Sequence, residues 1–238
     1  MTRTSQRLAV TVGLTIVVAW QGCQGPPSAA AGDPDQAPLP ENPRQIFEDM
    51  KAARFREATV GLEFRADSVI VTERLAGRTP DQAMALVAEG NRKLDTNRRT
   101  GALTAYARAV RTDPDNALAY NGLGRALVTK GKIEYALAAY LTAARLDATL
   151  AAAPFGAAMT LARLGRFDDA IDQMQLAVEL DPANTDAHQR LAIWYYYLDD
   201  TDTAWQHVRV SRDLGQELPG QFIALLEAKS RQRPSITN

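Results

Sequence analysis

The fold is decided by two consecutive runs of 34 residues, AMALVAEGNRKLDTNRRTGALTAYARAVRTDPDN (residues 83–116) and ALAYNGLGRALVTKGKIEYALAAYLTAARLDATL (residues 117–150). When they are aligned, small and large residues follow one another in the same order. One alanine recurs at this step beyond the second run, at Ala102, Ala136, Ala170 and Ala204. A constant period of this length predicts one small structural unit that is copied along the chain.

Other positions keep the same period. Larger side chains stand four residues after each alanine, at Tyr106, Tyr140, Met174 and Val208. Small residues stand twelve before it, at Gly90, Gly124, Ala158 and Ala192. Small residues let two helix backbones approach, and the larger residue fills the space between units. Pro114 and Pro182 are placed to end the second helix of their units, since the residue before a proline is pushed away from the helical region.

At these positions the chain resembles the tetratricopeptide repeat family, whose units are pairs of antiparallel helices that bury their apolar faces by stacking. The resemblance implies an all-α fold, an α-solenoid of about four to five units with a C-terminal capping helix. Four units follow from it, and the match is strongest in the first two and weakest in the last: 83–116, 117–150, 151–184 and 185–218. We expect residues 219–230 to form the capping helix and residues 231–238 to be a tail.

The segment 42–82 is harder to interpret. Ile46, Phe47, Met50 and Ala53 lie on one helical stripe and predict a helix to about residue 59. Residues 69–72 (Val-Ile-Val-Thr) are β-branched and would suit a strand. The 34-residue register instead places a small residue and a proline where the repeat has them, at positions 68 and 80. We therefore predict a diverged helical unit over 42–82.

The N-terminus, residues 1–23, has the features of an export signal. Arg3 and Arg7 precede an apolar run of 13 residues, Leu8–Trp20, which is too short to span a bilayer. Cys23, the only cysteine, ends this region in a sequence that resembles the lipobox of bacterial lipoproteins, although Trp20 and Gln21 depart from that pattern.

The lipobox resemblance implies a lipid anchor at Cys23, followed by a disordered tether over 24–41. Gln24 is not the aspartate that retains lipoproteins at the inner membrane of enteric bacteria, which favours an outer-membrane lipoprotein facing the periplasm. The alternative is soluble export, to the periplasm or the medium, with cleavage after residues 29–31.

The residues of familiar catalytic and metal sites are scarce. The chain has two histidines, His188 and His207, and no cysteine after Cys23, so we predict no enzyme activity, metal or cofactor. Both histidines are expected to pack rather than ligate, and Asp199, Asp200 and Asp202 to form a solvated turn. The net charge of −1 argues against nucleic-acid binding, and we interpret Arg98, Arg99 and Arg111 as solvated charges.

The remaining candidate is the surface that the fold creates. In the tetratricopeptide repeat family, the first helices of successive units line a concave groove. The corresponding positions here combine apolar residues, amides and arginines, which suit the side chains, backbone and carboxylates of a peptide. We predict a groove lined by Asn91, Leu118, Asn121, Arg125, Phe155, Met159, Arg163, Gln189, Ile193 and Tyr196. The alternative for Ile193 and residues 195–197 is packing against the capping helix.

The family's clamp for chaperone tails uses lysine, asparagine and arginine at five groove positions, and only Asn91 matches it here. From the groove, the export signal and the scarcity of catalytic residues, we expect a non-enzymatic adaptor that is anchored to the envelope membrane and binds a protein or peptide partner. The sequence leaves its oligomeric state open. Two alternatives remain: a self-associating structural protein, and a regulatory subunit of an envelope enzyme system.

Overall fold

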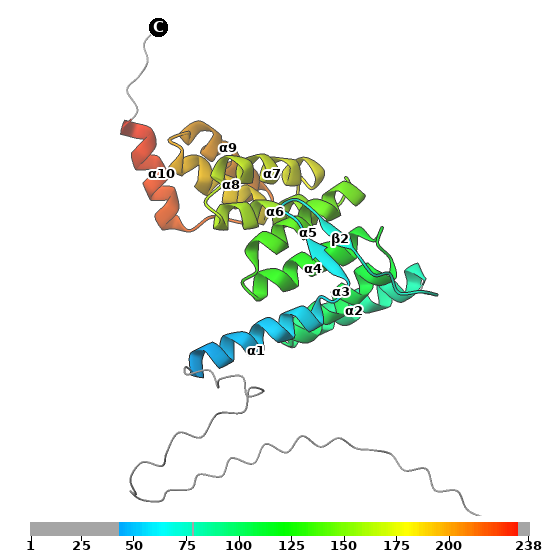
Figure 1. The fold of residues 1–238 in the computed structure, drawn as a ribbon. Helices are drawn as coiled ribbons and strands as arrows, with labels where there is room; N and C mark the ends of the chain where they lie inside the picture. The colour runs from blue at the N-terminus through cyan, green and yellow to red at the C-terminus, as the bar shows by residue number, and fades with distance from the viewer. Residues whose placement is uncertain (1–42, 78, 233–238) are drawn as a thin grey trace, which may run out of the picture. The chain divides into compact units, whose positions relative to one another are not determined.

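The structure is a computed structural model that describes residues 43–77 and 79–232. Cys23, the predicted signal peptide and the predicted tether therefore lie outside the described residues. The described chain begins with helix α1 (Pro43–Ala58) and the strands β1 (Leu62–Phe64) and β2 (Val69–Val71). It ends with helix α10 (Gly220–Gln232), as Figure 1 shows.

Between these elements, eight helices form four antiparallel pairs. The pairs are α2 (Pro80–Asp95) with α3 (Arg99–Thr112), α4 (Ala117–Thr129) with α5 (Ile133–Leu146), α6 (Ala152–Arg163) with α7 (Phe167–Leu180), and α8 (Thr185–Tyr197) with α9 (Thr201–Asp213). Successive pairs pack on one another, α3 on α4, α5 on α6 and α7 on α8. The predicted α-solenoid is therefore confirmed.

The turn inside each pair contains one residue in the left-handed backbone region. These residues are 34 positions apart: Asn97 (φ 57°), Gly131 (φ 71°), Gly165 (φ 77°) and Asp199 (φ 62°). Glycine adopts this conformation without strain, and asparagine and aspartate tolerate it better than other residues. The repeat therefore fixes the chain reversal as well as the helices.

Side-chain caps start several of the helices. Thr79 and Gln82 form a capping box at the start of α2. Asn116 and Asn184 each accept a hydrogen bond from a first-turn backbone N–H, of Ala119 at 3.0 Å and of Ala187 at 3.1 Å. Because these groups have no partner within the helix, each cap stabilises its helix by about 1 kcal/mol.

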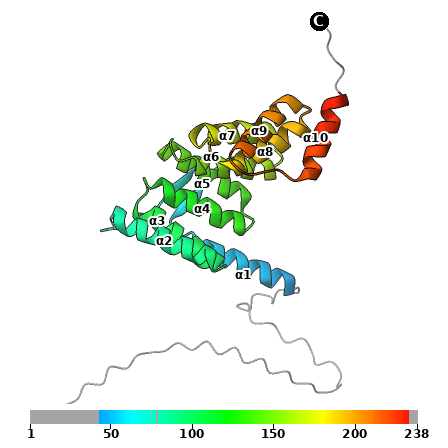
Figure 2. The same cartoon turned by 180° about the vertical axis from the view of Figure 1, so that it is seen from behind.

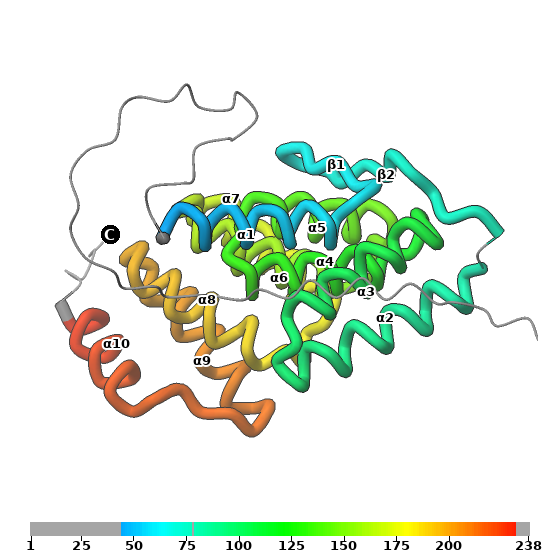
Figure 3. Tube along the Cα trace, turned by 60° about the horizontal axis from the view of Figure 1, so that its bottom comes forward, coloured from blue at the N-terminus to red at the C-terminus, as the bar shows by residue number. Residues whose placement is uncertain are grey.

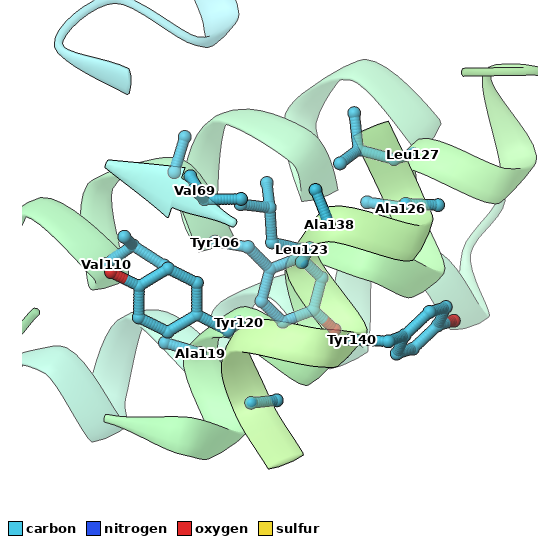
Figure 4. Packing of buried hydrophobic residues seen from close by; sticks show 14 of the residues in the cluster. Val69, Tyr106, Val110, Ala119, Tyr120, Leu123, Ala126, Leu127, Ala138 and Tyr140 are labelled. Atoms are coloured by element: carbon cyan, nitrogen blue, oxygen red, sulfur yellow. The ribbon is translucent and has the colours of Figure 1, made fainter. Parts of the chain in front are cut away.

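Two tyrosine rings lock the first three pairs together. A Cβ atom added at Gly90 or Gly122 would lie 2.6 or 2.2 Å from the ring of Tyr106, which is fully buried. The ring of Tyr140 is held in the same way between the next two glycines, Gly124 and Gly156. Each ring from a second helix thus fills a slot between two first helices, and Figure 4 shows both tyrosines in this core.

The segment after α1 corrects the prediction of a wholly helical unit over 42–82. β1 and β2 form an antiparallel hairpin in which Leu62 pairs with Val71 and Phe64 with Val69. The β-branched run favours a strand. Gly61 and Gly77, both at positive φ, flank the hairpin. Pro80 starts α2 instead of ending an earlier helix, so the 34-residue register was misleading here.

The hairpin is held on the second helices of the first two pairs. The backbone N–H of Val69 donates to Thr142 Oγ1 of α5 at 3.0 Å. Arg111 of α3 donates to the Glu73 carbonyl at 3.0 Å and pairs with the Glu73 carboxylate at 3.1 Å. The side chain of Arg111 is only 12% exposed. Its interpretation as a solvated charge was therefore wrong.

Helix α1 forms as predicted, but its apolar stripe is not buried. Ile46, Phe47 and Met50 are 42%, 57% and 50% exposed, whereas Phe55, near the end of the helix, stacks on Tyr135 of α5. Figure 3 shows α1 and the hairpin on the same side of the helix stack. Only the C-terminal part of α1 is therefore anchored to the repeats.

At the other end, α10 packs on the last pair. Leu226 of α10 is fully buried with Ala192 of α8 and Val208 of α9. Seen from behind in Figure 2, α10 lies beside α8 and α9. This core is separate from the larger cluster, which runs from Ala58 of α1 to Ala170 of α7. The C-terminal part of the stack therefore has smaller cores of its own.

Candidate functional site

The candidate site is a pocket of about 490 Å³ between the first helices of the second and third pairs. Because α2 packs on α4 and α4 on α6, these three first helices form one continuous layer. The pocket is lined by Asn121, Arg125, Val128, Tyr140, Ala152, Phe155, Gly156, Met159, Thr160 and Arg163. Its lining is mostly apolar and its edges carry charge.

The apolar part is built from side chains that the repeat holds in place. Phe155 and Met159, one turn apart on α6, are half-buried and pack against the core beneath them. Val128 contributes from α4. The Tyr140 ring reaches the pocket from α5 through the slot between Gly124 and Gly156. A partly exposed apolar floor of this kind suits the side chain of a bound segment.

The charged part consists of two arginines. Arg125 of α4 and Arg163 of α6 are both exposed and line the same pocket. Neither forms an ion pair with a carboxylate among the described residues. Burial raises the pKa of Tyr140 to about 12, so its phenol stays neutral between them at physiological pH. The pocket therefore offers two positive charges beside an uncharged floor.

Asn91 connects this pocket to the first pair. Its side-chain oxygen accepts hydrogen bonds from the Tyr106 hydroxyl at 2.7 Å and from Arg125 Nη1 at 3.2 Å. Asn91 therefore orients the Arg125 guanidinium, although it does not line the pocket. The side-chain oxygen of Asn121, which does, is buried without a hydrogen-bond partner among the described residues.

The ten residues predicted to line the groove divide into four groups. Asn121, Arg125, Phe155, Met159 and Arg163 line the pocket together. Asn91 contacts it through Arg125. Leu118, on α4, is 41% exposed outside the pocket lining.

The remaining predicted residues take part in packing. Gln189 donates to Ser211 Oγ of α9 at 3.2 Å. Ile193 and Tyr196 pack in the C-terminal core, where the Tyr196 ring meets Phe222 of α10 edge to face at 5.5 Å. For Ile193 and Tyr196 these contacts favour the packing alternative.

Sequence reasoning missed Tyr140 as a pocket residue, because only first helices were expected to line the groove. The available signal was the glycine pair at Gly124 and Gly156, which leaves no side chain between the ring and the groove. Val128 and Thr160 were also missed. They lie one helical turn from predicted residues.

The histidines and the acidic turn have structural contacts. His188 Nδ1 lies 2.9 Å from His207 Nδ1, and the Tyr195 ring stacks on His207. Asp200 caps α9 through the backbone N–H of Thr203, and Asp199 pairs with Lys229. Within the described part of the chain, no group of three or more histidine, cysteine or acidic side chains is placed to hold a metal ion.

The sequence of the helix pairs matches models of a known protein family. Two family models, both described as tetratricopeptide repeat, match residues 87–154 and 155–184. The chain is a tetratricopeptide repeat protein. Repeats of this kind generally form extended concave interaction surfaces and do not generally carry catalysis. No curated protein matches the sequence.

Several solved structures share the fold. MamA has a TM-score of 0.52 at 21% identity, with 57% of this chain and 80% of that chain covered. A tetratricopeptide repeat protein from Parabacteroides merdae has a TM-score of 0.55 at 18% identity, with 63% of this chain and 61% of that one covered. A chain of the Cut9–Hcn1 hetero-tetramer of the APC/C has a TM-score of 0.53 at 23% identity, with 65% of this chain and 31% of that chain covered. At these identities the likeness shows the fold alone.

The helices of the described residues include none that is both long enough and apolar enough to cross a membrane.

Proposed function

We propose that this protein is an interaction scaffold that holds an extended segment of a partner protein in the groove of its first helices. The observation that carries the proposal is the pocket between α4 and α6, with its apolar floor and two arginines. Burying an apolar side chain stabilises a complex by about 2 kcal/mol, and an arginine binds a carboxylate with two parallel hydrogen bonds. The segment it favours therefore has a large apolar side chain close to an acidic group.

The cellular setting is part of the same proposal. An export signal that ends at Cys23 would give the mature chain a lipid anchor, and the 18 residues from Gln24 to Glu41 would separate the anchor from the repeats. On this proposal the repeats stand at an envelope membrane, facing the periplasm, and help to assemble an envelope complex. Labelling with a radioactive fatty acid tests the anchor, because Cys23→Ser should abolish incorporation.

A crosslinking pull-down from native membranes tests the groove. The groove variant carries Asn121→Ala, Arg125→Ala and Phe155→Ala. The control carries Arg108→Ala and Leu176→Ala, which change exposed residues of the second helices α3 and α7 outside the pocket. We expect wild type and control to capture the same envelope proteins and the folded groove variant to lose them. Identical capture by all three would refute the groove as the binding surface.

Self-association is a second candidate, favoured by the apolar residues exposed at both ends of the stack. At the N-terminal end these are Ile46, Phe47 and Met50 of α1, and at the C-terminal end Leu198 and Leu225. Contact between the two ends would join copies head to tail, which generates rings or filaments. Sedimentation velocity over a hundredfold concentration range distinguishes this candidate, since a monomeric adaptor keeps one sedimentation coefficient.

A further inference from the structure

A second pocket, of about 740 Å³, lies away from the groove, between α1 and the turns of the first two helix pairs. Helix α1 contributes one wall, α3 a second, and the α4–α5 turn a third. Its lining residues are Glu48, Asp49, Lys51, Ala52, Arg54, Phe55, Arg99, Thr100, Leu103, Thr129, Lys130 and Lys132. The proposed function of the groove makes no use of it.

Positive charge dominates this lining. Lys51 is neutralised by Glu48 at 2.9 Å, which leaves Arg54, Arg99, Lys130 and Lys132 against the single carboxylate of Asp49. None of these four cations has an ion pair with a carboxylate among the described residues. The four come from three separate elements. Their convergence is therefore a product of the fold and not of a run of basic residues.

The contacts of these cations orient them without neutralising them. Lys130 donates to the Thr100 hydroxyl across the two turns, and Arg99 Nε donates to Asn97 Oδ1 at 2.8 Å. Lys132 Nζ lies 5.2 Å from the centre of the Phe55 ring. Burial, and then repulsion by Arg99 and Arg54, lowers the pKa of Lys130. The cations of this pocket therefore repel one another, and a bound anion would relieve that repulsion.

From this geometry we infer that the pocket walled by Arg54, Arg99, Lys130 and Lys132 binds a phosphate group. The lining carries a net charge of about +3, counting Lys51 and Glu48 as a neutral pair, so a carboxylate with one charge leaves most of the repulsion in place. A phosphate monoester carries about −1.5 to −2 charges and three strong acceptor oxygens at neutral pH. Two arginines and two lysines supply the donors that such a group requires.

Two sources of the phosphate are compatible with this chemistry, a lipid headgroup and a soluble phosphate compound. The pocket lies beside α1, the first described element after the predicted tether, which makes a headgroup accessible if Cys23 is lipidated. Binding of a soluble phosphate needs no anchor. The basic pocket shares no lining residue with the groove, so this inference does not depend on the groove proposal. The experiments below distinguish the two sources of phosphate.

The test is isothermal titration of the full chain with pyrophosphate in 50 mM salt. We expect saturable binding that weakens at least tenfold in Arg54→Met and in Lys130→Met. The matched control is Arg209→Met, which removes an exposed arginine of α9 far from the lining and should change the affinity less than twofold. No saturable binding at 10 mM pyrophosphate, or equal weakening in all three variants, would overturn the inference.

A second arm identifies the source. Vesicles of phosphatidic acid, whose headgroup is a phosphate monoester, and phosphatidylethanolamine (about 1:3) are sedimented with wild type and with an Arg54→Met/Lys130→Met variant. Both proteins are the full chain, so any contribution of the N-terminal segment is the same in the two samples. A headgroup ligand predicts fewer bound copies of the variant and competition by pyrophosphate. Equal sedimentation, together with pyrophosphate binding, assigns a soluble phosphate. Binding of an acidic peptide here without pyrophosphate binding would contradict both.

Discussion

The second and fourth repeats are built on the same 34-residue period, but different forces hold them. In the second repeat the Tyr140 ring fills a slot between Gly124 and Gly156, and the core there is continuous with its neighbours. In the fourth repeat Val208 occupies the tyrosine position and Ala192 the glycine position. A histidine pair joins α8 to α9, and Tyr195 and Tyr196 pack in the core that is shared with α10. The period therefore specifies where the helices lie, and the residues at its fixed positions decide how rigidly they are joined.

This difference bears on function. The proposed binding pocket lies in the part of the stack where tyrosines interlock with glycines, so its apolar floor is held in place, and Asn91 orients Arg125. Preorganised groups bind with a smaller loss of conformational entropy. The fourth repeat lies beyond it and uses its corresponding groove positions, Ile193 and Tyr196, to attach the capping helix.

The largest expected effect comes from closing one slot. In Gly122→Ala the new Cβ would lie 2.2 Å from Cε1 of a fully buried ring, so we expect a loss of about 3 kcal/mol in unfolding free energy. The control is Gly101→Ala in α3, whose Cβ meets only the flexible Lys93 side chain at 3.1 Å. This change should stabilise the protein by about 0.5 kcal/mol. Urea unfolding measures both.

A double variant sharpens the same comparison. The third repeat has Met174 and Ala158 where the second has Tyr140 and Gly124. Tyr140→Met should therefore make Gly124→Ala less damaging, so the double variant is more stable than the sum of the single losses predicts. Simple additivity would show that the ring does not occupy the slot.

In the fourth repeat, we expect a pH dependence that the second lacks. Burial, with repulsion from His188, lowers the pKa of His207 to about 4, below its ordinary value of 6.5. The unfolded chain therefore binds a proton that the folded chain does not. Stability should be full above pH 6.5 and fall by about 1–2 kcal/mol between pH 6.5 and 4, after allowance for partial exposure of the ring.

The measurement is the difference in unfolding free energy between wild type and His207→Asn at each pH, since carboxylates titrate in both chains. The asparagine amide keeps a polar group near His188 Nδ1 but does not titrate. A difference that stays constant from pH 7 to 4 would show that His207 is not held neutral.

The smallest expected change in stability comes from removing the hydroxyl groups of Tyr106 and Tyr140, and it should differ between the two. The Tyr106 hydroxyl donates to Asn91, so Tyr106→Phe should cost about 1 kcal/mol. The Tyr140 hydroxyl has no hydrogen-bond partner among the described residues, and Tyr140→Phe should change stability by less than about 0.5 kcal/mol. Equal losses in thermal unfolding would contradict the distinct roles assigned to Tyr106 and Tyr140.

The sequence predicted the fold correctly where the 34-residue period is regular. From residue 83 to 218, alanines, prolines and turn residues at fixed spacing indicated the helix pairs, because each position has one packing role. Before Pro80 the same register favoured a helix, whereas the β-branched residues of β2 and Gly61 formed a hairpin. The strand preference of the β-branched residues prevailed over the repeat register in this segment. The segment is held to α3 and α5 by individual contacts of Arg111 and Thr142, and these contacts do not follow from the 34-residue period.

The site was predictable only in part for a similar reason. Position in the repeat indicated which α4 and α6 residues share the pocket, such as Arg125 and Arg163. It could not indicate that Tyr140 reaches the pocket from a second helix, or that Ile193 and Tyr196 contact α10. The basic pocket beside α1 was not visible, because Arg54, Arg99 and Lys130 are brought together only by the packing of α1 on the turns.

The most direct test of the central claim is selection of peptides from a random display library against the full chain, followed by affinity measurement. We predict enriched sequences with a large apolar residue near an acidic residue or C-terminal carboxylate. These peptides should bind the Arg163→Met variant at least tenfold more weakly than wild type, whereas Arg209→Met should change their affinity less than twofold. Enriched peptides that bind wild type and Arg163→Met equally would contradict the assignment of the groove between α4 and α6 as the binding surface.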